Sequence, residues 1–312
     1  MPLPERQLIA MIRRMAGSLP QGVGIGDDCA VVALPKGHEA LVTTDFSIEN
    51  VHFRREWHPA DSVGWRCLAR GLSDIAAMGG EPRAVFLSLA LPRELPQKWV
   101  DQFFAGFLKL AKQYEVQLAG GDIAESPAGV LADIVVLGSV PKGKSILRSG
   151  ARVGDFVYVT GTLGASVSTL ELLREGKKPR CSEHRRHFYP EPRIKVGQYL
   201  REKKLASAMI DTSDGLSVDL GHICEEGGVG AVIYSESLPR LPGPKGLQFA
   251  LHGGEDYELV FTAGPRKRVP DQIDGVRVTR IGEIVVGSSI HVADAQGRSR
   301  PLQTKGWQHF ER

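Results

Sequence analysis

The sequence has few cysteines, and none of them lie close together. The four cysteines are Cys29, Cys67, Cys181 and Cys224, and they form no CxxC motif. A disulfide framework or a zinc site is therefore not expected. Reduced, buried thiols in a cytosolic protein are the better interpretation.

Long apolar runs are also missing. No stretch approaches the roughly 20 apolar residues that span a bilayer. Residues 1–17 lack the long uncharged apolar core of a signal peptide. We therefore expect a cytoplasmic protein with no membrane partner.

The chain has little excess of either charge sign. Its formal net charge is +3 over 312 residues, and acidic and basic residues are interspersed. This argues against nucleic acid as the main ligand. The hydrophobic content of 42% and charged content of 24% are typical of a soluble globular protein that is long enough for two cores.

Hydrophobic periodicity predicts alternating helices and strands with glycine-rich turns. In the first half it predicts helices over 5–16, 61–78 and 96–114 and strands over 40–44, 84–91, 116–119 and 133–140. A stretch rich in Gly, Lys and Arg over 141–155 indicates a domain junction. The second half continues with strands 156–160, 208–210, 257–262, 277–284 and 289–292 and helices 164–174, 192–202 and 216–226. We expect an α+β domain over 1–145 and a mixed-sheet α/β domain over 146–312.

Acidic residues recur beside glycines or at the ends of apolar runs. The five places are Gly26-Asp27-Asp28, Thr43-Thr44-Asp45, Ser73-Asp74, Gly120-Gly121-Asp122 and Asp211-Thr212-Ser213-Asp214-Gly215. Each alone could be a turn or a helix cap. Together they favour Mg²⁺ bound by carboxylates, with glycine amides near phosphate, as in phosphoryl transfer.

One conventional phosphate-binding motif is a false lead. Residues 138–145 fit GxxxxGK[ST], but a P-loop requires a helix to begin at the lysine. Here Gly150 and Gly154 interrupt any such helix, so an exposed basic connector is expected. The basic segment 174–186 is likewise expected to be a solvated helix end and loop.

The acidic clusters and their flanking residues, in this order, resemble the thiamine-monophosphate kinase family of the aminoimidazole ribonucleotide synthetase superfamily. The matching segments are GIGDDCAVV (24–32), TTDFSIENVHF (43–53), LSDIAAMGGEPRA (72–84), GGDIAES (120–126), LRSGARVGD (147–155), IDTSDGLSVDL (210–220), HGGEDYELVFT (252–262) and GWQHF (306–310). The resemblance covers nearly the whole chain.

The resemblance implies ATP-dependent phosphorylation of thiamine phosphate to thiamine diphosphate, without a protein base. It implies a homodimer formed through the sheet of the N-terminal domain. The implied Mg²⁺ ligands are Asp28, Thr43, Thr44, Asp45, Asp74, Asp122, Asp211 and Asp214. The implied ATP contacts are Gly121, Asp122, Arg148 and Ser213, and the implied contacts to thiamine phosphate are His52, Glu255 and Trp307.

Two positions depart from the family pattern. Asn50 stands where the family usually has glycine, in the loop that leads to His52, and Ile123 replaces a threonine after Gly-Gly-Asp. Neither departure removes a charged ligand.

Other assignments within the superfamily fit less well. A selenophosphate synthetase resemblance would require a reactive residue in an N-terminal glycine-rich loop, and no cysteine precedes Cys29. A hydrogenase-maturation dehydratase would end in a cysteine-bearing tail, whereas this sequence ends QHFER. A catalytically silent nucleotide-binding module would have lost several of the acidic residues, which are all present.

Overall fold

The structure is a computed structural model that describes residues 1–17, 22–25 and 29–307. The chain divides into two compact units, each with its own sheet. The first unit holds Met1–Ile75, Glu81–Gly143 and Phe188–Pro190, and the second holds Ala76–Gly80, Lys144–His187 and Glu191–Arg312. The expectation of two domains with mixed α and β structure is confirmed.

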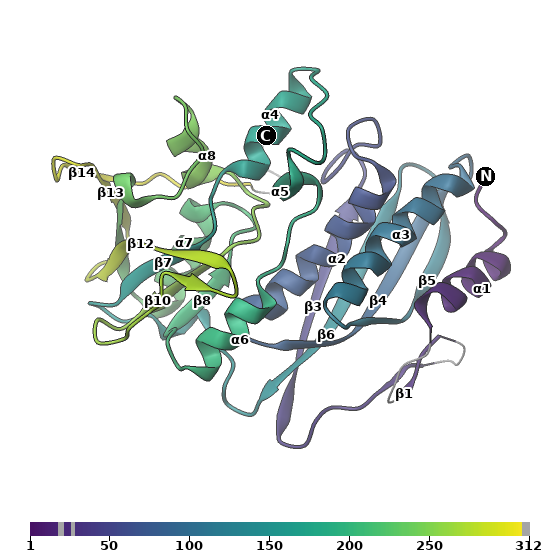
Figure 1. Cartoon of the computed structure of the whole chain (residues 1–312), viewed down its shortest axis with the longest axis horizontal. Coiled ribbons are helices and arrows are strands. Elements are labelled where there is room, and N and C mark those ends of the chain that lie inside the picture. Colours follow the sequence, from purple (N-terminus) through teal and green to yellow (C-terminus); the bar gives the residue numbers. More distant parts are fainter. Residues whose placement is uncertain (18–21, 26–28, 308–312) are drawn as a thin grey trace. The chain divides into compact units, whose positions relative to one another are not determined.

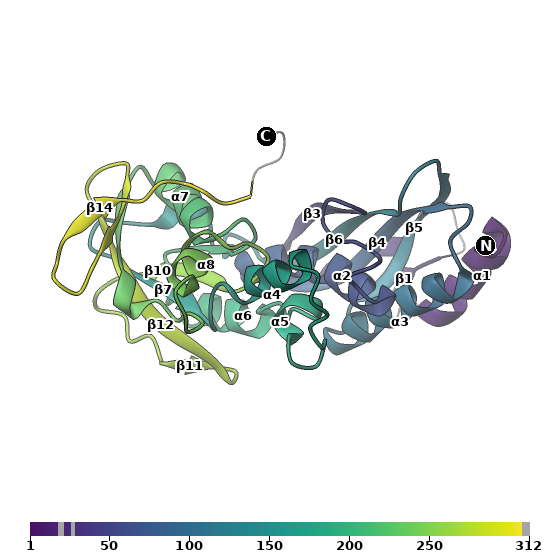
Figure 2. The same ribbon diagram turned by 90° about the horizontal axis from the view of Figure 1, so that it is seen from above.

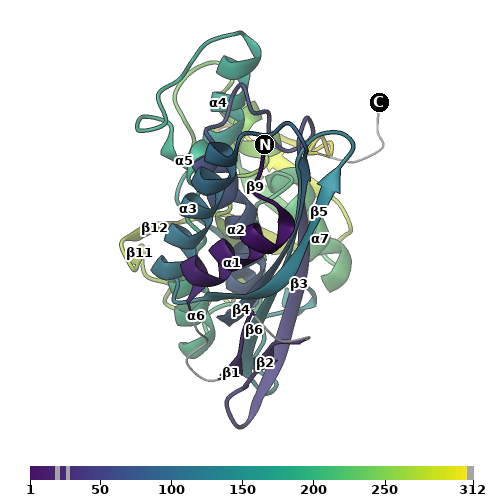
Figure 3. The same ribbon diagram turned by 90° about the vertical axis from the view of Figure 1, so that its right-hand side faces the viewer.

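The first unit is a four-stranded sheet with helices on one face (Figure 1). The strand order is β3-β6-β4-β5, so β3 and β5 form opposite edges. Its elements are α1 (Glu5–Ala16), β1 (Gly22–Val23), β2 (Val31–Val32), β3 (His38–Ile48), α2 (Ala60–Ala77), β4 (Glu81–Pro92), α3 (Gln97–Gln113), β5 (Gln117–Ser126) and β6 (Leu131–Pro141). Figure 3 shows α2 and α3 on the same side of this sheet.

Helices α2 and α3 pack unusually closely because glycine stands at their contact. A Cβ atom at Gly106 would lie 1.8 Å from the carbonyl oxygen of Asp61, and one at Gly64 would lie 2.0 Å from that of Phe103. The aromatic rings of Phe103, Phe104 and Phe107 on α3 are fully buried. Large side chains therefore fill the core around a contact where only glycine fits.

The second unit is built on a larger sheet with the order β14-β13-β9-β12-β7-β10-β8, to which β11 adds by pairing with β12. Helices α7 and α8 supply much of its core, with α7 packed on the sheet (Figure 2). The elements are η1 (Arg148–Gly150), β7 (Phe156–Thr160), α4 (Ala165–Arg174), α5 (Arg185–Phe188), α6 (Ile194–Glu202), β8 (Ala208–Asp211), α7 (Leu216–Gly227), β9 (Gly230–Tyr234), η2 (Ser235–Ser237), α8 (Gly246–His252), β10 (Leu259–Ala263), β11 (Gln272–Ile273), β12 (Val276–Val285), β13 (Ile290–Ala293) and β14 (Ser299–Pro301).

Two predicted strands are too short. β3 continues to Ile48, so Asp45 lies inside the strand and not at its end. β5 continues to Ser126, so Gly120, Gly121 and Asp122 also lie within a strand. At Gly121 a Cβ atom would lie 1.9 Å from the carbonyl oxygen of Leu87, so close pairing with β4 requires glycine there.

The basic connector after β6 contains no P-loop. Lys144 follows a turn, and the next helical element is the three-residue η1 at Arg148–Gly150. No helix therefore begins at the lysine, as the sequence predicted. In the ranges that the structure describes, we also find no helix with the length and apolar character to cross a membrane.

The expectation of buried thiols holds for two of the four cysteines. Cys67 and Cys224 are buried, whereas Cys29 is exposed and Cys181 is half-buried, and none forms a disulfide. Burial raises the pKa of the Cys67 thiol to about 12 and that of Cys224 to about 11. These two thiols are therefore inert at neutral pH.

Candidate active site

In the first unit, β3 and α2 bring three predicted metal ligands together. Strand alternation turns Thr43 and Asp45 toward the face covered by α2, where they are half-buried. The Thr43 hydroxyl donates a hydrogen bond to a carboxylate oxygen of Asp74 on α2. The structure therefore groups Thr43, Asp45 and Asp74.

The two carboxyl groups of this cluster repel each other. The pKa of Asp45 is raised above its ordinary value, first by burial and then by the neighbouring charge of Asp74, while Arg70 opposes the rise. Two carboxylates forced together in this way are relieved by a proton or by a cation. A bound cation would therefore be favoured between Asp45 and Asp74.

Asp122 lies on the opposite face and the opposite edge of the same sheet. Cross-strand register places Phe46, Asp133, Ser88 and Asp122 in one row across the four strands. Adjacent strands are about 4.8 Å apart, so β3 and β5 are separated by about 14 Å. Within one sheet, Asp122 therefore cannot share an ion with Asp45. Thr44 also points its side chain to this exposed face, away from Thr43.

His52 is fixed by a turn that follows β3. The backbone N–H of Ile48 donates to His52 Nδ1 at 3.0 Å, and the His52 N–H donates to the Ile48 carbonyl oxygen at 2.9 Å. Asn50 has a φ of 67°, in the left-handed region. Because asparagine adopts this conformation more readily than most residues, it can replace the glycine that we noted as usual here.

The predicted ligand Asp28 lies outside the described residues, together with Asp27.

In the second unit, the loop from Asp211 to Gly215 links β8 to α7. Asp211 is buried, whereas Ser213 and Asp214 are half-buried. Asp219, which is not among the predicted site residues, lies in the first turn of α7 and accepts a hydrogen bond from the Gly215 N–H at 2.9 Å. The pKa of Asp219 is raised well above its ordinary value by burial and then by the charges of Asp211 and Asp214. Three carboxyl groups therefore share this end of the sheet.

Two predicted substrate residues are bonded to this same loop. The Glu255 N–H donates to the Ser213 carbonyl oxygen at 2.8 Å, and the Trp307 N–H donates to that of Asp214 at 3.1 Å. Trp307 as a whole is 47% exposed. Glu255 has a φ of 62°, a strained conformation of the kind found at functional sites. Arg148 is exposed on η1, an element that contacts α7 and β8.

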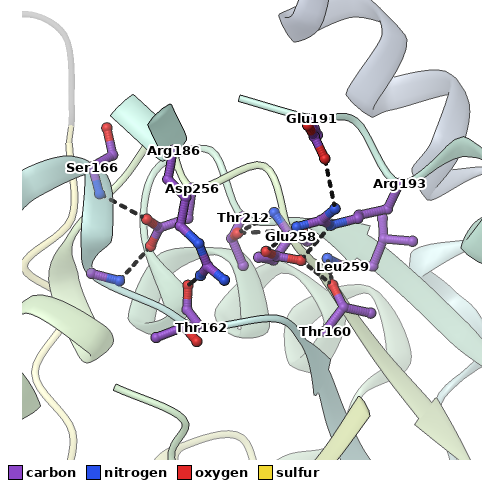
Figure 4. A network of polar contacts seen from close by, with 11 residues as sticks. Thr160, Thr162, Ser166, Arg186, Glu191, Arg193, Thr212, Asp256, Glu258 and Leu259 are labelled. Atoms are coloured by element: carbon purple, nitrogen blue, oxygen red, sulfur yellow. Dashed lines mark hydrogen bonds and ion pairs between the residues drawn. The ribbon is translucent and has the colours of Figure 1, made fainter. Parts of the chain in front are cut away.

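The other acids beside Glu255 have structural duties. Asp256 accepts hydrogen bonds from the N–H groups of Gly164 and Ser166 at the start of α4, at 2.6 and 3.0 Å. The contact with Ser166 is visible in Figure 4. Figure 4 also shows the buried Glu258 paired with Arg193. Neither Asp256 nor Glu258 was a predicted site residue. The segment GGEDYEL does not itself reveal that these two acids are buried.

The carboxylates suit Mg²⁺ better than a metal that needs a complete protein cage. Among the described residues, no three His, Cys, Asp or Glu side chains converge as a metal-binding set. Mg²⁺ commonly uses one or two carboxylates and completes its shell with water and substrate phosphate. Asp45 with Asp74, and Asp211 with Asp214, fit that pattern.

Known proteins match almost the whole chain. Residues 26–140 match the family described as AIR synthase related protein, N-terminal domain, and residues 152–294 match the corresponding C-terminal domain. The thiamine-monophosphate kinase of Escherichia coli (strain K12) is 37% identical over 304 residues, which are 92% of each chain. The chain belongs to the thiamine-monophosphate kinase family.

Other thiamine-monophosphate kinases are also similar to this chain over nearly its full length. The Bacillus subtilis (strain 168) kinase is 35% identical and covers 93% of this chain and 94% of its own. The crystal structure of the Stenotrophomonas maltophilia K279a kinase has a TM-score of 0.81 at 35% identity, covering 94% of this chain and 97% of its own. The structure of AaThiL complexed with AMPPCP and TMP has a TM-score of 0.80 at 33% identity, covering 99% and 97%. The family resemblance predicted from the motifs is confirmed.

The fold extends beyond this kinase family. The hydrogenase maturation protein HypE of E. coli has a TM-score of 0.78 at 20% identity, covering 98% of each chain. At that identity the similarity concerns the fold alone.

Proposed function

We propose that this protein transfers the γ-phosphoryl group of ATP to thiamine phosphate, giving thiamine diphosphate and ADP. One observation carries the assignment: Glu255 and Trp307 are both hydrogen-bonded to the loop that holds Ser213 and Asp214. Groups suited to a heteroaromatic cation therefore adjoin groups suited to nucleotide and metal. The AaThiL complex with AMPPCP and TMP supports this pairing of ligands.

The proposed acceptor contacts match the chemistry of thiamine phosphate. The thiazolium ring carries a positive charge, which a carboxylate at Glu255 and an exposed indole at Trp307 can both stabilise. His52 would donate a hydrogen bond through Nε2, because its Nδ1 accepts one from Ile48. Gly121, Asp122, Arg148 and Ser213 remain the proposed ATP contacts.

We propose Mg²⁺ as the metal. Its ligands would come from Asp28, Thr43, Thr44, Asp45, Asp74, Asp122, Asp211 and Asp214. When bound, Mg²⁺ would neutralise the phosphate charge that builds up during transfer. The charge repulsion between Asp45 and Asp74 supports the presence of a cation beside them.

The reaction needs no protein base. A phosphate oxygen of thiamine phosphate attacks the γ-phosphorus in line, the bond to the β–γ bridging oxygen breaks, and ADP leaves. A phosphate monoester has a second pKa of about 6, so the nucleophile is already largely a dianion at neutral pH. The role of this chain's residues is to position both phosphates and to lower their repulsion.

We further propose a cytoplasmic homodimer. The exposed sheet face of the first unit carries Val42 and Phe46, which are 65% and 53% exposed, beside Val135 and Phe86. These exposed apolar side chains lie on a face that also carries Asp133 and Asp122, and they are suited to contact with a second copy. All four cysteines are free thiols, which supports a reducing compartment.

The decisive assay measures ADP release and thiamine diphosphate together. Wild-type protein with ATP and Mg²⁺ should release ADP only when thiamine phosphate is present, with chromatography showing thiamine diphosphate. ADP release that ignores thiamine phosphate, without thiamine diphosphate, would refute the proposal.

The proposed ligands can be tested in the same assay. Asp45→Ala and Asp122→Ala should lose activity while the circular dichroism spectrum stays unchanged. Asp101→Ala, an exposed change on α3, is the matched control. Near-normal turnover in both variants would contradict their role.

A further inference from the structure

A buried ion pair in the second unit involves Glu258, three residues after the proposed acceptor contact Glu255. Figure 4 shows Arg193 facing Glu258. Arg193 Nη2 lies 2.5 Å from Glu258 Oε1, and Arg193 Nε lies 2.7 Å from Glu258 Oε2. The side chains are 14% and 2% exposed. This two-pronged contact fixes the orientation of both groups and not only their separation.

The pair leaves Glu258 no spare capacity for chemistry. The Thr160 hydroxyl also donates to Oε2, at 2.6 Å. A Cβ atom at Gly161 would lie 2.0 Å from Oε1, so the carboxylate is enclosed on that side as well. Glu258 therefore serves neither as a base nor as a metal ligand, although it belongs to the most distinctive motif of the chain.

The backbone of Glu258 is hydrogen-bonded to the loop from Asp211 to Gly215. Its N–H donates to the Thr212 hydroxyl at 3.0 Å, and its carbonyl oxygen accepts from the Thr212 N–H at 2.8 Å. Thr212 lies between Asp211 and Ser213. Any shift of Glu258 is therefore passed directly to the loop that carries those two residues.

The strained segment that carries Glu255 is hydrogen-bonded to the same loop. Glu255 and Tyr257 have φ values of 62° and 51°, which non-glycine residues adopt only when their surroundings impose them. The Tyr257 N–H donates to the Thr212 carbonyl oxygen at 3.0 Å, and the Glu255 N–H donates to that of Ser213 at 2.8 Å. The acceptors of these two bonds are Thr212 and its neighbour Ser213, and Thr212 is itself hydrogen-bonded to Glu258. The conformation of the strained turn therefore depends on the position of Glu258.

Arg193 reaches this point from a third segment, immediately before α6. We propose that Arg193 is a positioning residue for thiamine phosphate, which acts through Glu258 to hold Glu255 in its binding conformation. This inference rests on the proposed function. It assigns the pair a role in acceptor affinity beyond holding the unit together.

The variant Arg193→Met removes the guanidinium and keeps most of the aliphatic stem. We expect the KM for thiamine phosphate to rise roughly 30-fold, because small misplacements at a site cost up to about 100-fold. Arg193→Lys, which keeps a charge but loses the paired contact, should fall between wild type and Arg193→Met. Lys195→Met on α6, where the side chain is 72% exposed, is the matched control and should behave as wild type.

A double-mutant cycle separates positioning from general damage. If Arg193 acts through Glu255, adding Arg193→Met to Glu255→Gln should raise the KM for thiamine phosphate by less than about threefold. A purely structural role would give the full 30-fold increase in both backgrounds, and that result would overturn the proposal. If Arg193→Met does not fold, the cycle is run with Arg193→Lys, and additive effects there overturn the proposal equally.

The wild-type reaction distinguishes the two levels of inference. Absence of thiamine diphosphate from wild-type protein refutes the proposed function and this role with it. Normal wild-type product with an additive cycle refutes the positioning role alone.

Discussion

Asp256 gives a quantitative prediction about stability and pH. The carboxyl group is buried, and burial raises its pKa from 3.8 to about 7, helped by the charge of Glu258. The N–H groups of Gly164 and Ser166 and the charge of Arg186 oppose this rise without cancelling it. The folded protein therefore holds a proton on Asp256 that the unfolded chain releases at much lower pH.

The sign of the effect follows from this difference. Below about pH 4 both states are protonated, and the stabilising contribution of the proton is complete. As the pH rises through 7 the folded state must ionise a buried group, and that contribution is lost. Each pKa unit corresponds to about 1.4 kcal/mol, so the full loss is about 4 kcal/mol, of which more than half falls between pH 5 and 8.

The variant Asp256→Asn should remove this pH dependence. The asparagine oxygen can accept from only one of the two N–H groups at the start of α4, which costs stability by an amount that does not change with pH, and asparagine has no proton to release. In urea unfolding followed by circular dichroism, the free energy of unfolding of the variant relative to wild type should rise by about 2 to 3 kcal/mol between pH 5 and pH 8. Asp271→Asn, at an exposed position in the same unit, is the control.

One result would refute the reasoning. If Asp256→Asn loses stability relative to wild type as the pH rises, the carboxylate is ionised in the folded protein. The N-terminus of α4 would then outweigh burial.

Three further changes test the packing, the acceptor site and the dimer. Gly106→Ala should lower the free energy of unfolding by about 3 kcal/mol in urea, because its Cβ would overlap a backbone oxygen; Gly221→Ala, with open space around it, should cost nothing. Trp307→Ala should raise the KM for thiamine phosphate about tenfold with the KM for ATP unchanged, since a cation–π contact is worth roughly 1–2 kcal/mol, and Trp307→Phe should retain most of the affinity. Phe46→Asp should give a monomer in analytical ultracentrifugation, whereas Val286→Asp, at an exposed apolar residue of the second unit, should not. An unchanged unfolding free energy, an equal rise in both KM values, or an intact dimer would contradict the respective argument.

The amino-acid pattern predicts most elements of this fold because their apolar residues recur at clear intervals. It misplaces Asp45 and Asp122 at strand ends, because polar residues and glycines normally mark where strands stop. Here β3 and β5 are edge strands of the four-stranded sheet, and each strand continues past its polar residue: Asp122 reaches solvent, whereas Asp45 lies near Asp74 on the face covered by α2. Helix α8 was not predicted, because its seven residues are too few to show a helical period.

The motifs indicate which residues matter but not what each one does. In GGEDYEL, three acids stand within four positions, and their roles diverge only when the backbone is known. Glu255 is half-buried beside Ser213, Asp256 is enclosed at α4, and Glu258 is paired with Arg193. Arg193 lies about 60 residues away in a loop, where nothing in the sequence distinguishes it from other arginines.

The placement of Asp45 and Asp122 on opposite edges of one sheet has a genetic consequence. If two copies of the chain join so that the β3 edge of one approaches the β5 edge of the other, each site draws on both copies. A chain that lacks Asp45 and a chain that lacks Asp122 would then be inactive alone. Together in one cell they would restore function, because half of the sites in a mixed pair are intact.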